Sequence, residues 1–432
     1  MSGKPIAVRD SVSMYSIRER FGSGILAGGA IYYILASAAL NVTNFLFHVV
    51  VSRIIGPTAY GGLGAVLGVI ALLTVPVSAL QIAVTRTVSN QQLTNGHSLH
   101  MLARRSIIVG IAGCVIIVAL FPVLDSFLHF KSSLPIVLTG IWIPFAVLAA
   151  VLQGSLIGEY RFTSVAIASF VGGGLVRLVV GIALTLLGYG VTGAVVSTVV
   201  AQVVTTMWLV VLTRHQTRRR LTAEVISTTR TDIAYSVSVL AGLSALTGVD
   251  TFLARHFLSA TVAGQYAAGA IAAHIALFVP TAVVTITFPH FSNQTLSAGS
   301  RRKAFYQAFL YVFALGGLTT TAMVAVPKIL TNILFGSSYN EAWGVIRPLS
   351  IESFFLGIMT LLSYLYLSRR QVWSLMPWLG TVVAVVVIGM THESAQGLAV
   401  VMTVVVGVTT VFALMRLKLA LKFTDLTNDI EN

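Results

Sequence analysis

One arginine stands inside an apolar stretch, 163–187, and follows three consecutive glycines, Gly172 to Gly174. A charged side chain within an apolar helix of membrane-spanning length is costly and marks a functional site by default. The planar guanidinium of this residue, Arg177, offers five donors that suit a phosphate or a carboxylate. The glycines permit close backbone approach. The pattern predicts an anion-binding residue, and the alternative is a structural arginine bonded to carbonyl groups that the glycines expose.

Three more ionisable residues fall within apolar stretches later in the chain: Asp250, His274 and Glu352. Carboxylates and imidazoles at membrane depth can take up and release protons or bind cations. We therefore expect ion coupling from these three residues. The alternatives are local pairing at the membrane surface for Asp250, and a hydrogen bond to a neighbouring helix for His274.

Two arginines, Arg53 and Arg255, occupy matching positions after the first apolar stretch of each half of the chain. They predict a basic vestibule that receives an anionic substrate, and the alternative is anchoring of helix ends by snorkelling. His97 and His100 have no cysteine or acidic neighbours, so no metal site is expected. The phosphate-binding motif GxxxxGK[ST] does not occur, and no cofactor is expected.

The elements that must position these residues are membrane helices. Of 432 residues, 56% are hydrophobic and 9% are charged, against roughly a quarter charged in soluble proteins. Apolar runs of about 20 residues are long enough to cross a bilayer. The runs are 25–51, 62–83, 106–124, 135–157, 163–187, 191–213, 233–254, 264–289, 304–326, 345–368, 373–391 and 396–415. The sequence predicts an all-α polytopic membrane protein with about twelve transmembrane helices.

The distribution of Lys and Arg predicts the orientation. If the N-terminus is cytoplasmic, 21 of the 27 basic residues fall on the cytoplasmic side and five on the other, with Arg177 inside a helix. This asymmetry follows the positive-inside rule and places both termini in the cytoplasm. The same asymmetry explains the net charge of +14, because the cytoplasmic basic residues lie next to anionic lipid. No nucleic acid partner is therefore expected.

The order of glycines and prolines repeats along the chain. Gly61 and Gly264 are 203 residues apart, and Pro76 and Pro280 are 204 apart. Six helices per repeat is an even number, so both halves enter the membrane from the same side and form a parallel repeat. The expected divisions are a cytoplasmic tail 1–24, a six-helix half 25–213, a cytoplasmic linker 214–230, a second half 231–416 and a cytoplasmic tail 417–432.

The turn after the first helix carries a resemblance to a known family. Ser52-Arg53-Ile-Ile-Gly-Pro-Thr-Ala-Tyr-Gly61 resembles the R-x-L-G-P-x-x-Y-G turn of the polysaccharide transporter (oligosaccharide flippase, Wzx-like) family, with Ile55 where Leu is usual. This family is a branch of the multidrug/oligosaccharidyl-lipid/polysaccharide flippase superfamily. Further similar segments are Gln153-Gly154 to Phe162, Arg177 to Ala194, Asp250 to Tyr266 and Phe335 to Ala342.

The resemblance implies a flippase that moves a polyprenyl-pyrophosphate-linked oligosaccharide from the inner to the outer leaflet by alternating access, for cell-surface polysaccharide biosynthesis. It implies location in a prokaryotic inner (plasma) membrane and cationic cavity residues that face the substrate. Its expected partners are the lipid-linked oligosaccharide, membrane lipid and other membrane proteins of polysaccharide assembly. On this interpretation the chain is not an enzyme.

Two other classes of function remain open. An ion-coupled efflux antiporter of small amphiphilic compounds would favour carboxylates within the membrane, but no acidic residue occurs between Glu19 and Asp125. A membrane polymerase or ligase would need a long outward loop with paired Arg or His, and no such loop is expected here. A non-transporting scaffold is the remaining alternative.

Overall fold

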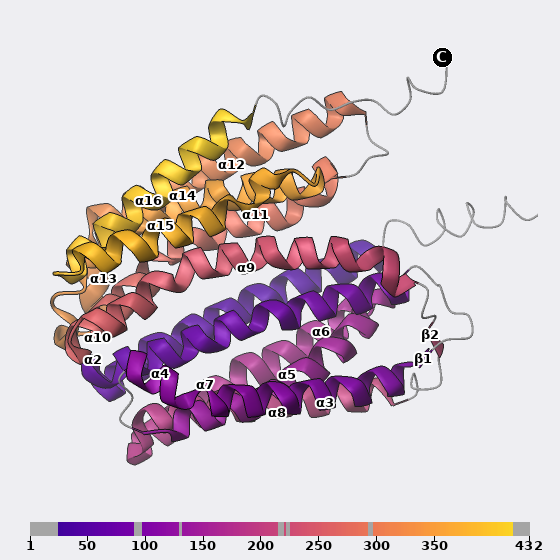
Figure 1. Cartoon of the computed structure of the whole chain (residues 1–432), viewed down its shortest axis with the longest axis horizontal. Coiled ribbons are helices and arrows are strands. Elements are labelled where there is room, and N and C mark those ends of the chain that lie inside the picture. The colour runs from indigo at the N-terminus through magenta and orange to yellow at the C-terminus, as the bar shows by residue number, and fades with distance from the viewer. Residues whose placement is uncertain are drawn as a thin grey trace, which may run out of the picture.

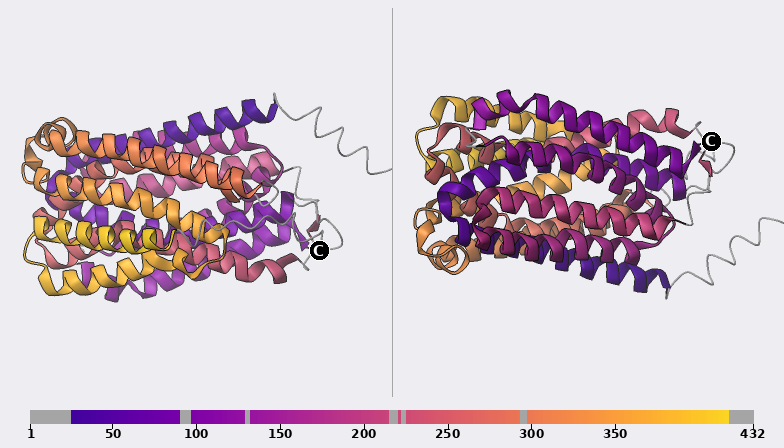
Figure 2. Two further views of the ribbon diagram at one scale, coloured as in Figure 1. Left: turned by 90° about the horizontal axis from the view of Figure 1, so that it is seen from above. Right: turned by 90° about the horizontal axis from the view of Figure 1, so that it is seen from below.

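The computed structural model describes residues 25–89, 97–128, 132–214, 220–221, 225–292 and 297–417. Within these ranges the only strands are β1 (His97–Ser98) and β2 (Arg220–Leu221), which pair antiparallel. The expected tail 1–24, nearly all of the expected tail 417–432 and most of the linker's loop lie outside the described residues. Helix α2 begins and helix α16 ends at the same end of a lengthwise bundle (Figure 2).

Helices of the first half precede residue 214. They are α2 (Ile25–Ser89), α3 (Leu99–Ala119), α4 (Phe121–Leu128), α5 (Leu134–Gly158), α6 (Phe162–Ala168), η1 (Ser169–Val176), α7 (Arg177–Leu184), η2 (Thr185–Tyr189) and α8 (Gly190–Thr213). Helices of the second half are α9 (Val225–Phe257), α10 (Ala260–Ala273), α11 (Ile275–Ser292), α12 (Ala298–Ala325), α13 (Pro327–Leu334), η3 (Ser337–Tyr339), α14 (Trp343–Ser368), η4 (Val372–Leu375), α15 (Met376–Thr391) and α16 (Ala395–Met415).

Ten helical segments of the described chain are long and apolar enough to span a membrane, and two of them are of double length. The segment Leu35–Thr85 has 51 residues and turns at Gly56, whose φ is +74°. The segment Phe162–Thr213 has 52 residues and turns at Gly188 and Gly190, with φ of +88° and +50°. Such backbone angles favour glycine. Because each long segment crosses twice, the described chain has twelve crossings, and the expected all-α membrane class is confirmed.

The two halves repeat the same arrangement of central and peripheral helices. The fourth helix of each half, α5 and α14, is central: 61% of the most apolar stretch of α5 and 67% of that of α14 are buried. The third helix, α3 and α12, is peripheral, with 11% and 22% buried. Exposed valine and isoleucine side chains cover α3, and exposed leucine, phenylalanine and tyrosine side chains cover α12, as lipid contact requires. The exact bounds of the two halves stay predictions, because the division passes through residues outside the described ranges.

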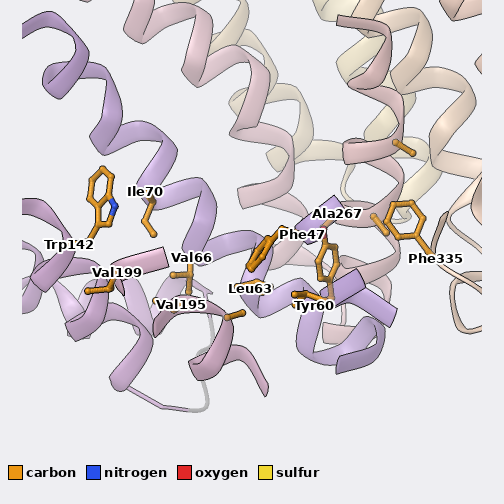
Figure 3. Close-up of a cluster of buried hydrophobic side chains, with 14 of the residues drawn as sticks. Phe47, Tyr60, Leu63, Val66, Ile70, Trp142, Val195, Val199, Ala267 and Phe335 are labelled. Carbon is orange, nitrogen blue, oxygen red and sulfur yellow. The ribbon is translucent and has the colours of Figure 1, made fainter. Parts of the chain in front are cut away.

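The bundle has two ends that matter for the site. In Figure 1, α4, α13 and the turn of α2 lie at the left, and β1 and β2 lie at the right. These ends are named the α4–α13 end and the β1–β2 end below. Near the α4–α13 end, a buried cluster joins the halves: Phe47, Tyr60 and Leu63 pack with Ala267 and Phe335 (Figure 3).

Two glycines allow the backbones of the two halves to approach each other closely at this contact. An added Cβ at Gly264 would overlap the carbonyl oxygen of Pro57, and one at Gly61 would lie 2.9 Å from the backbone nitrogen of Gly264. The backbones of α2 and α10 therefore touch directly. The repeat-related glycines of the sequence mark the place where the two halves meet.

Candidate functional site

A cavity of about 490 Å³ lies between the two halves. The first half contributes residues of α2, among them His48, Gly64 and Gly68, and the second half contributes residues of α9, α10, α11 and α14. Its polar lining groups are His48, Ser244, Thr247, Thr251, His274, Thr281, Thr360 and Tyr364. No Asp, Glu, Lys or Arg stands among the lining residues of the described chain. The cavity wall is therefore apolar with scattered hydroxyl groups and two imidazoles.

Two glycines of α2 hold this wall against the second half. A Cβ at Gly68 would lie 2.8 Å from the Phe252 ring, and one at Gly64 would lie 3.2 Å from the Ala267 Cβ. Small residues at helix interfaces allow such close packing in membranes. The cavity thus sits beside a tight contact between the halves, where a relative movement of the halves changes its shape.

Arg177 lies in the first half at the start of α7, directly after the π-helical turn η1. Its Nη1 donates a 3.0 Å hydrogen bond to Asn44 Oδ1, and its guanidinium stacks 4.2 Å from the centroid of Phe47. Its Nε is buried without a hydrogen-bond partner in the described structure. The residue is half-buried and is not among those that line the cavity. It contacts α2 on the segment that supplies the cavity with His48.

The glycines before Arg177 have a clear packing role. A Cβ at Gly172 would overlap Thr205 of α8, and one at Gly174 would lie 2.6 Å from Thr43 Oγ1 of α2. The triplet therefore brings three helices together at the arginine. A wide π-helical turn is often found at functional sites.

His48 is a residue that the sequence analysis missed. It lines the cavity, and its Nδ1 shares a 3.0 Å hydrogen bond with the hydroxyl of Tyr60. The Tyr60 ring stands edge-on to the ring of Tyr339, whose hydroxyl donates a 2.9 Å bond to the carbonyl of Ser52. The signal in the sequence was the spacing of Asn44 and His48, four residues apart on one helix face.

Asp250 and Glu352 are brought together in the second half. Both are fully buried, Asp250 on α9 and Glu352 on α14, and they lie close enough for a charge on one to affect the other. Asp250 Oδ2 accepts a 2.8 Å bond from the Tyr266 hydroxyl, and its Oδ1 accepts a 2.7 Å bond from the backbone N–H of Thr251. Both carboxylate oxygens of Glu352 are buried without a partner in the described structure. Because Thr251 lines the cavity, this carboxylate pair lies directly behind the cavity wall.

His274 stands on the cavity wall where α10 ends and α11 begins. Its Nε2 is buried and has no hydrogen-bond partner among the described residues. The interruption of the helix at this residue places an imidazole beside the cavity, on the half opposite to His48.

Arg53 and Arg255 lie at the α4–α13 end. Arg53 Nε donates a 2.8 Å bond to the carbonyl of Leu334, at the end of α13. Arg255 Nε donates a 2.9 Å bond to the carbonyl of Leu128, at the end of α4. Each arginine therefore reaches from one half to the other. The structure brings Asp250 and Glu352 together, places Arg53 and Arg255 at one end, and stacks Arg177 on Phe47 of the buried cluster near that end.

Comparisons with known proteins agree on the fold. A family model described as polysaccharide biosynthesis protein matches residues 50–343, more than half of the chain. No curated protein matches the sequence. Among solved structures, the chain is similar to the lipid II flippase MurJ in an inward closed conformation, with a TM-score of 0.72 and 11% identity over 90% of this chain and 87% of that chain.

The chain is also similar to a MATE transporter in a straight conformation, with a TM-score of 0.62 and 15% identity over 92% of this chain and 96% of that chain. A MOP superfamily transporter from Pyrococcus furiosus matches with a TM-score of 0.55 and 17% identity over the same shares. Identities this low show a shared fold and no more. The family match covers the turn at Arg53, residue Arg177 and the segment around Asp250, which carried the resemblance in the sequence. The chain is a multi-pass membrane protein that belongs to the polysaccharide biosynthesis protein family and has the fold of MOP-superfamily transporters.

Proposed function

We propose that this protein is a flippase that moves a polyprenyl-pyrophosphate-linked oligosaccharide from the inner to the outer leaflet for cell-surface polysaccharide biosynthesis. The observation that carries the proposal is the cavity between two pseudo-repeated halves, in a chain of the polysaccharide biosynthesis protein family. A site shared by both halves can open to either end as the halves rock. The proposed step moves a molecule and makes or breaks no covalent bond.

The proposed orientation places the β1–β2 end in the cytoplasm of a prokaryotic inner membrane, with both termini there. Exposed basic residues support it: Arg104, Arg214, Arg302 and Lys303 belong to the loops and helix ends of the predicted cytoplasmic side. The α4–α13 end is then the outer end. In this orientation the closed contact at that end corresponds to a state that receives substrate from inside.

The proposed substrate site combines Arg177 with the cavity. Arg177 supplies a forked donor for pyrophosphate, and its present acceptor, Asn44, lies one helical turn before His48 on the cavity wall. The guanidinium would exchange the amide oxygen for phosphate oxygens, which are stronger acceptors because they are charged. Hydroxyl groups of Ser244, Thr247 and Thr360 would face the sugar, and the prenyl tail would stay in lipid.

Arg53 and Arg255 belong to the same proposal as residues of the outer mouth. When the α4–α13 end opens, their guanidinium groups leave the carbonyls of α13 and α4. They are then available to an anionic head group on its way out. Membrane lipid and other membrane proteins of polysaccharide assembly complete the proposed set of partners.

Ion coupling is proposed for the carboxylates and for His274. A buried carboxylate without a partner is stable only when it is protonated or paired with a cation. Glu352 is such a group, and Asp250 stands within its electrostatic reach. Binding of a proton or a metal cation there, and at His274 beside the cavity, would favour one arrangement of α9, α10 and α14 over the other.

Replacing Glu352 by glutamine tests this coupling. We expect the variant to fold with unchanged or slightly raised thermal stability, because a buried ionisable group is exchanged for a neutral one of the same shape. Transport in proteoliposomes should lose its dependence on an imposed pH or Na⁺ gradient. Asp250→Asn should show the same loss, and Glu393→Gln, an exposed carboxylate of the α15–α16 loop, should not. A Glu352→Gln variant that still responds fully to both gradients would exclude Glu352 from coupling.

The second candidate function is ion-coupled efflux of small amphiphilic compounds. The observation that favours it is the similarity to MATE structures, together with the buried carboxylates of the second half. The apolar cavity wall would suit such a compound. Against it stands the match to the polysaccharide biosynthesis family over 50–343.

Proteoliposomes separate the two functions. The purified protein is reconstituted with a fluorescent polyprenyl-pyrophosphate saccharide, and the fraction quenched by dithionite from outside is followed over time. A flippase exposes the inner pool at a rate well above that of protein-free vesicles, and an amphiphilic cation in excess does not compete. Failure to expose the lipid, with uptake of the amphiphilic cation driven by a gradient, would favour the antiporter.

A further inference from the structure

The contact that closes the α4–α13 end is built twice, once from each half. At the first copy, Arg53 of α2 reaches the C-terminus of α13 in the second half. Its Nε donates to the carbonyl of Leu334 at 2.8 Å, and its Nη2 donates to the carbonyls of Ile333 and Asn332. One guanidinium therefore reaches three consecutive carbonyl groups at this helix end, where carbonyls run short of intrahelical partners; of the three, the Asn332 carbonyl also accepts from the backbone N–H of Gly336.

The second copy also joins an arginine to a short helix's C-terminus, in the opposite direction. Arg255 of α9 reaches the C-terminus of α4 in the first half, where its Nε donates to the carbonyl of Leu128 at 2.9 Å. The next residue, His256, has its Nδ1 2.8 Å from the carbonyl oxygen of Phe127, and its ring stacks on that of Phe127 at 4.0 Å. A short helix of the first half is thus capped by the second half.

The two copies are related by a pseudo-twofold axis that passes through the contact. Thr58 and Thr261 are 203 residues apart, the offset of the sequence repeat, and their hydroxyl oxygens lie 2.8 Å from one another. Gly61 and Gly264 have the same offset and meet backbone to backbone. Residues that are equivalent by symmetry touch each other only at the axis, as in an isologous dimer interface.

We propose that Arg53 and Arg255 form two symmetric latches that hold the α4–α13 end shut, and that both must release when this end opens. Each latch joins a cation to a helix C-terminus, where the helix dipole and unpaired carbonyls favour positive charge. Any separation of the halves about the shared axis lengthens both sets of bonds together. The end therefore opens in one step, with no stable state in which a single latch is broken.

The latches suit a gate because their release leaves no polar group without a hydrogen-bond partner. Helix-end carbonyls and guanidinium groups both pair readily with water once the end is open. Arg53 is exposed even in the closed state, whereas Arg255 is buried there and gains access to water on opening. This inference goes beyond the proposed function, since it holds for any substrate that the cavity carries.

The test uses a cysteine that only opening exposes. Ala263 is 2% exposed and its backbone lies at the contact with Gly61. In a background with Cys114→Ser, Ala263→Cys reports opening through its rate of reaction with a maleimide in detergent or nanodiscs. We compare Arg53→Gln, Arg255→Gln and the double variant with the latched protein, and use Arg347→Gln as the matched control. Arg347 is an exposed arginine of α14 that stacks 5.7 Å from Trp343.

Each single variant should raise the labelling rate about tenfold, because a hydrogen bond to a charged group contributes roughly that factor to an equilibrium. The double variant should exceed either single variant, and Arg347→Gln should label at the latched rate. Arg53→Lys should label at a rate between those of the parent and of Arg53→Gln. Lysine keeps the positive charge but lacks the planar, forked donors of the guanidinium. A thermal unfolding midpoint within a few degrees of the parent shows that each variant is folded. A folded double variant that labels no faster than the parent overturns the proposal, as does an equal increase in Arg347→Gln.

Discussion

Arg177→Ala is expected to lower the rate of lipid-linked saccharide translocation by about ten- to a hundredfold, the loss of one or two hydrogen bonds to a charged group. The expected cause is the loss of the forked donor for pyrophosphate. Arg177→Lys should recover part of the rate, because the charge remains and the fork does not. The measurement is the initial rate of dithionite-accessible lipid in proteoliposomes with matched protein content.

The variant Asn44→Ala distinguishes whether Arg177 binds an anion or only packs α7 against α2. In the structure Arg177 donates to Asn44 and stacks on Phe47. If the arginine serves only to hold α7 against α2, Asn44→Ala should cost as much translocation as Arg177→Ala. If the arginine binds substrate, Asn44→Ala should keep most of the rate, since the guanidinium is still present. Arg104→Ala, an exposed arginine of α3, is the control for a general loss of positive charge.

A disulfide between residues 58 and 261 is expected to stop transport completely and reversibly. The hydroxyl oxygens of Thr58 and Thr261 lie 2.8 Å apart on opposite halves, so sulfur atoms in their places are close to the 2.05 Å bonding distance. Oxidation of Thr58→Cys/Thr261→Cys, in a Cys114→Ser background, ties the halves at the α4–α13 end. Alternating access requires these halves to separate there.

The readout is transport before oxidation, after oxidation and after reduction with dithiothreitol. The oxidised protein should be inactive, the reduced protein should recover, and each single cysteine variant should be unaffected by the oxidant. An oxidised, fully cross-linked protein that still transports at the reduced rate would contradict separation of the halves at this end.

Much of the architecture could be predicted because membrane spans depend on length and apolarity alone. The stretch 135–157 corresponds to α5 (Leu134–Gly158), and 396–415 corresponds to α16 (Ala395–Met415). Gly61 and Gly264, which marked the repeat in the sequence, meet backbone to backbone in the structure, a contact that the repeat alone did not predict. The expected stretch 106–124 ran too far, because apolar residues continue from α3 into the separate short helix α4.

The site was less predictable because it depends on helix rotation and on contacts distant in sequence. Apolarity placed Glu352 in a helix, but only packing shows that it shares a buried region with Asp250. Arg177 meets Asn44 across 133 residues, and no local pattern encodes that contact. His48 was missed because a single histidine in an apolar helix resembles any buried polar residue. Arg53 donates to backbone carbonyls, which are present at every residue, so no side-chain pattern in the sequence predicts these partners.

A deletion strain shows whether this chain exposes a lipid-linked saccharide on the outer face of the membrane. Lipid-linked saccharides are extracted from cells without the gene, and their sidedness is probed with a glycan-modifying enzyme added from outside. We expect an accumulated pool that the enzyme cannot reach, restored to outward exposure by the wild-type chain and not by Arg177→Ala. A pool of normal size that the enzyme modifies fully in the deletion strain would contradict this expectation.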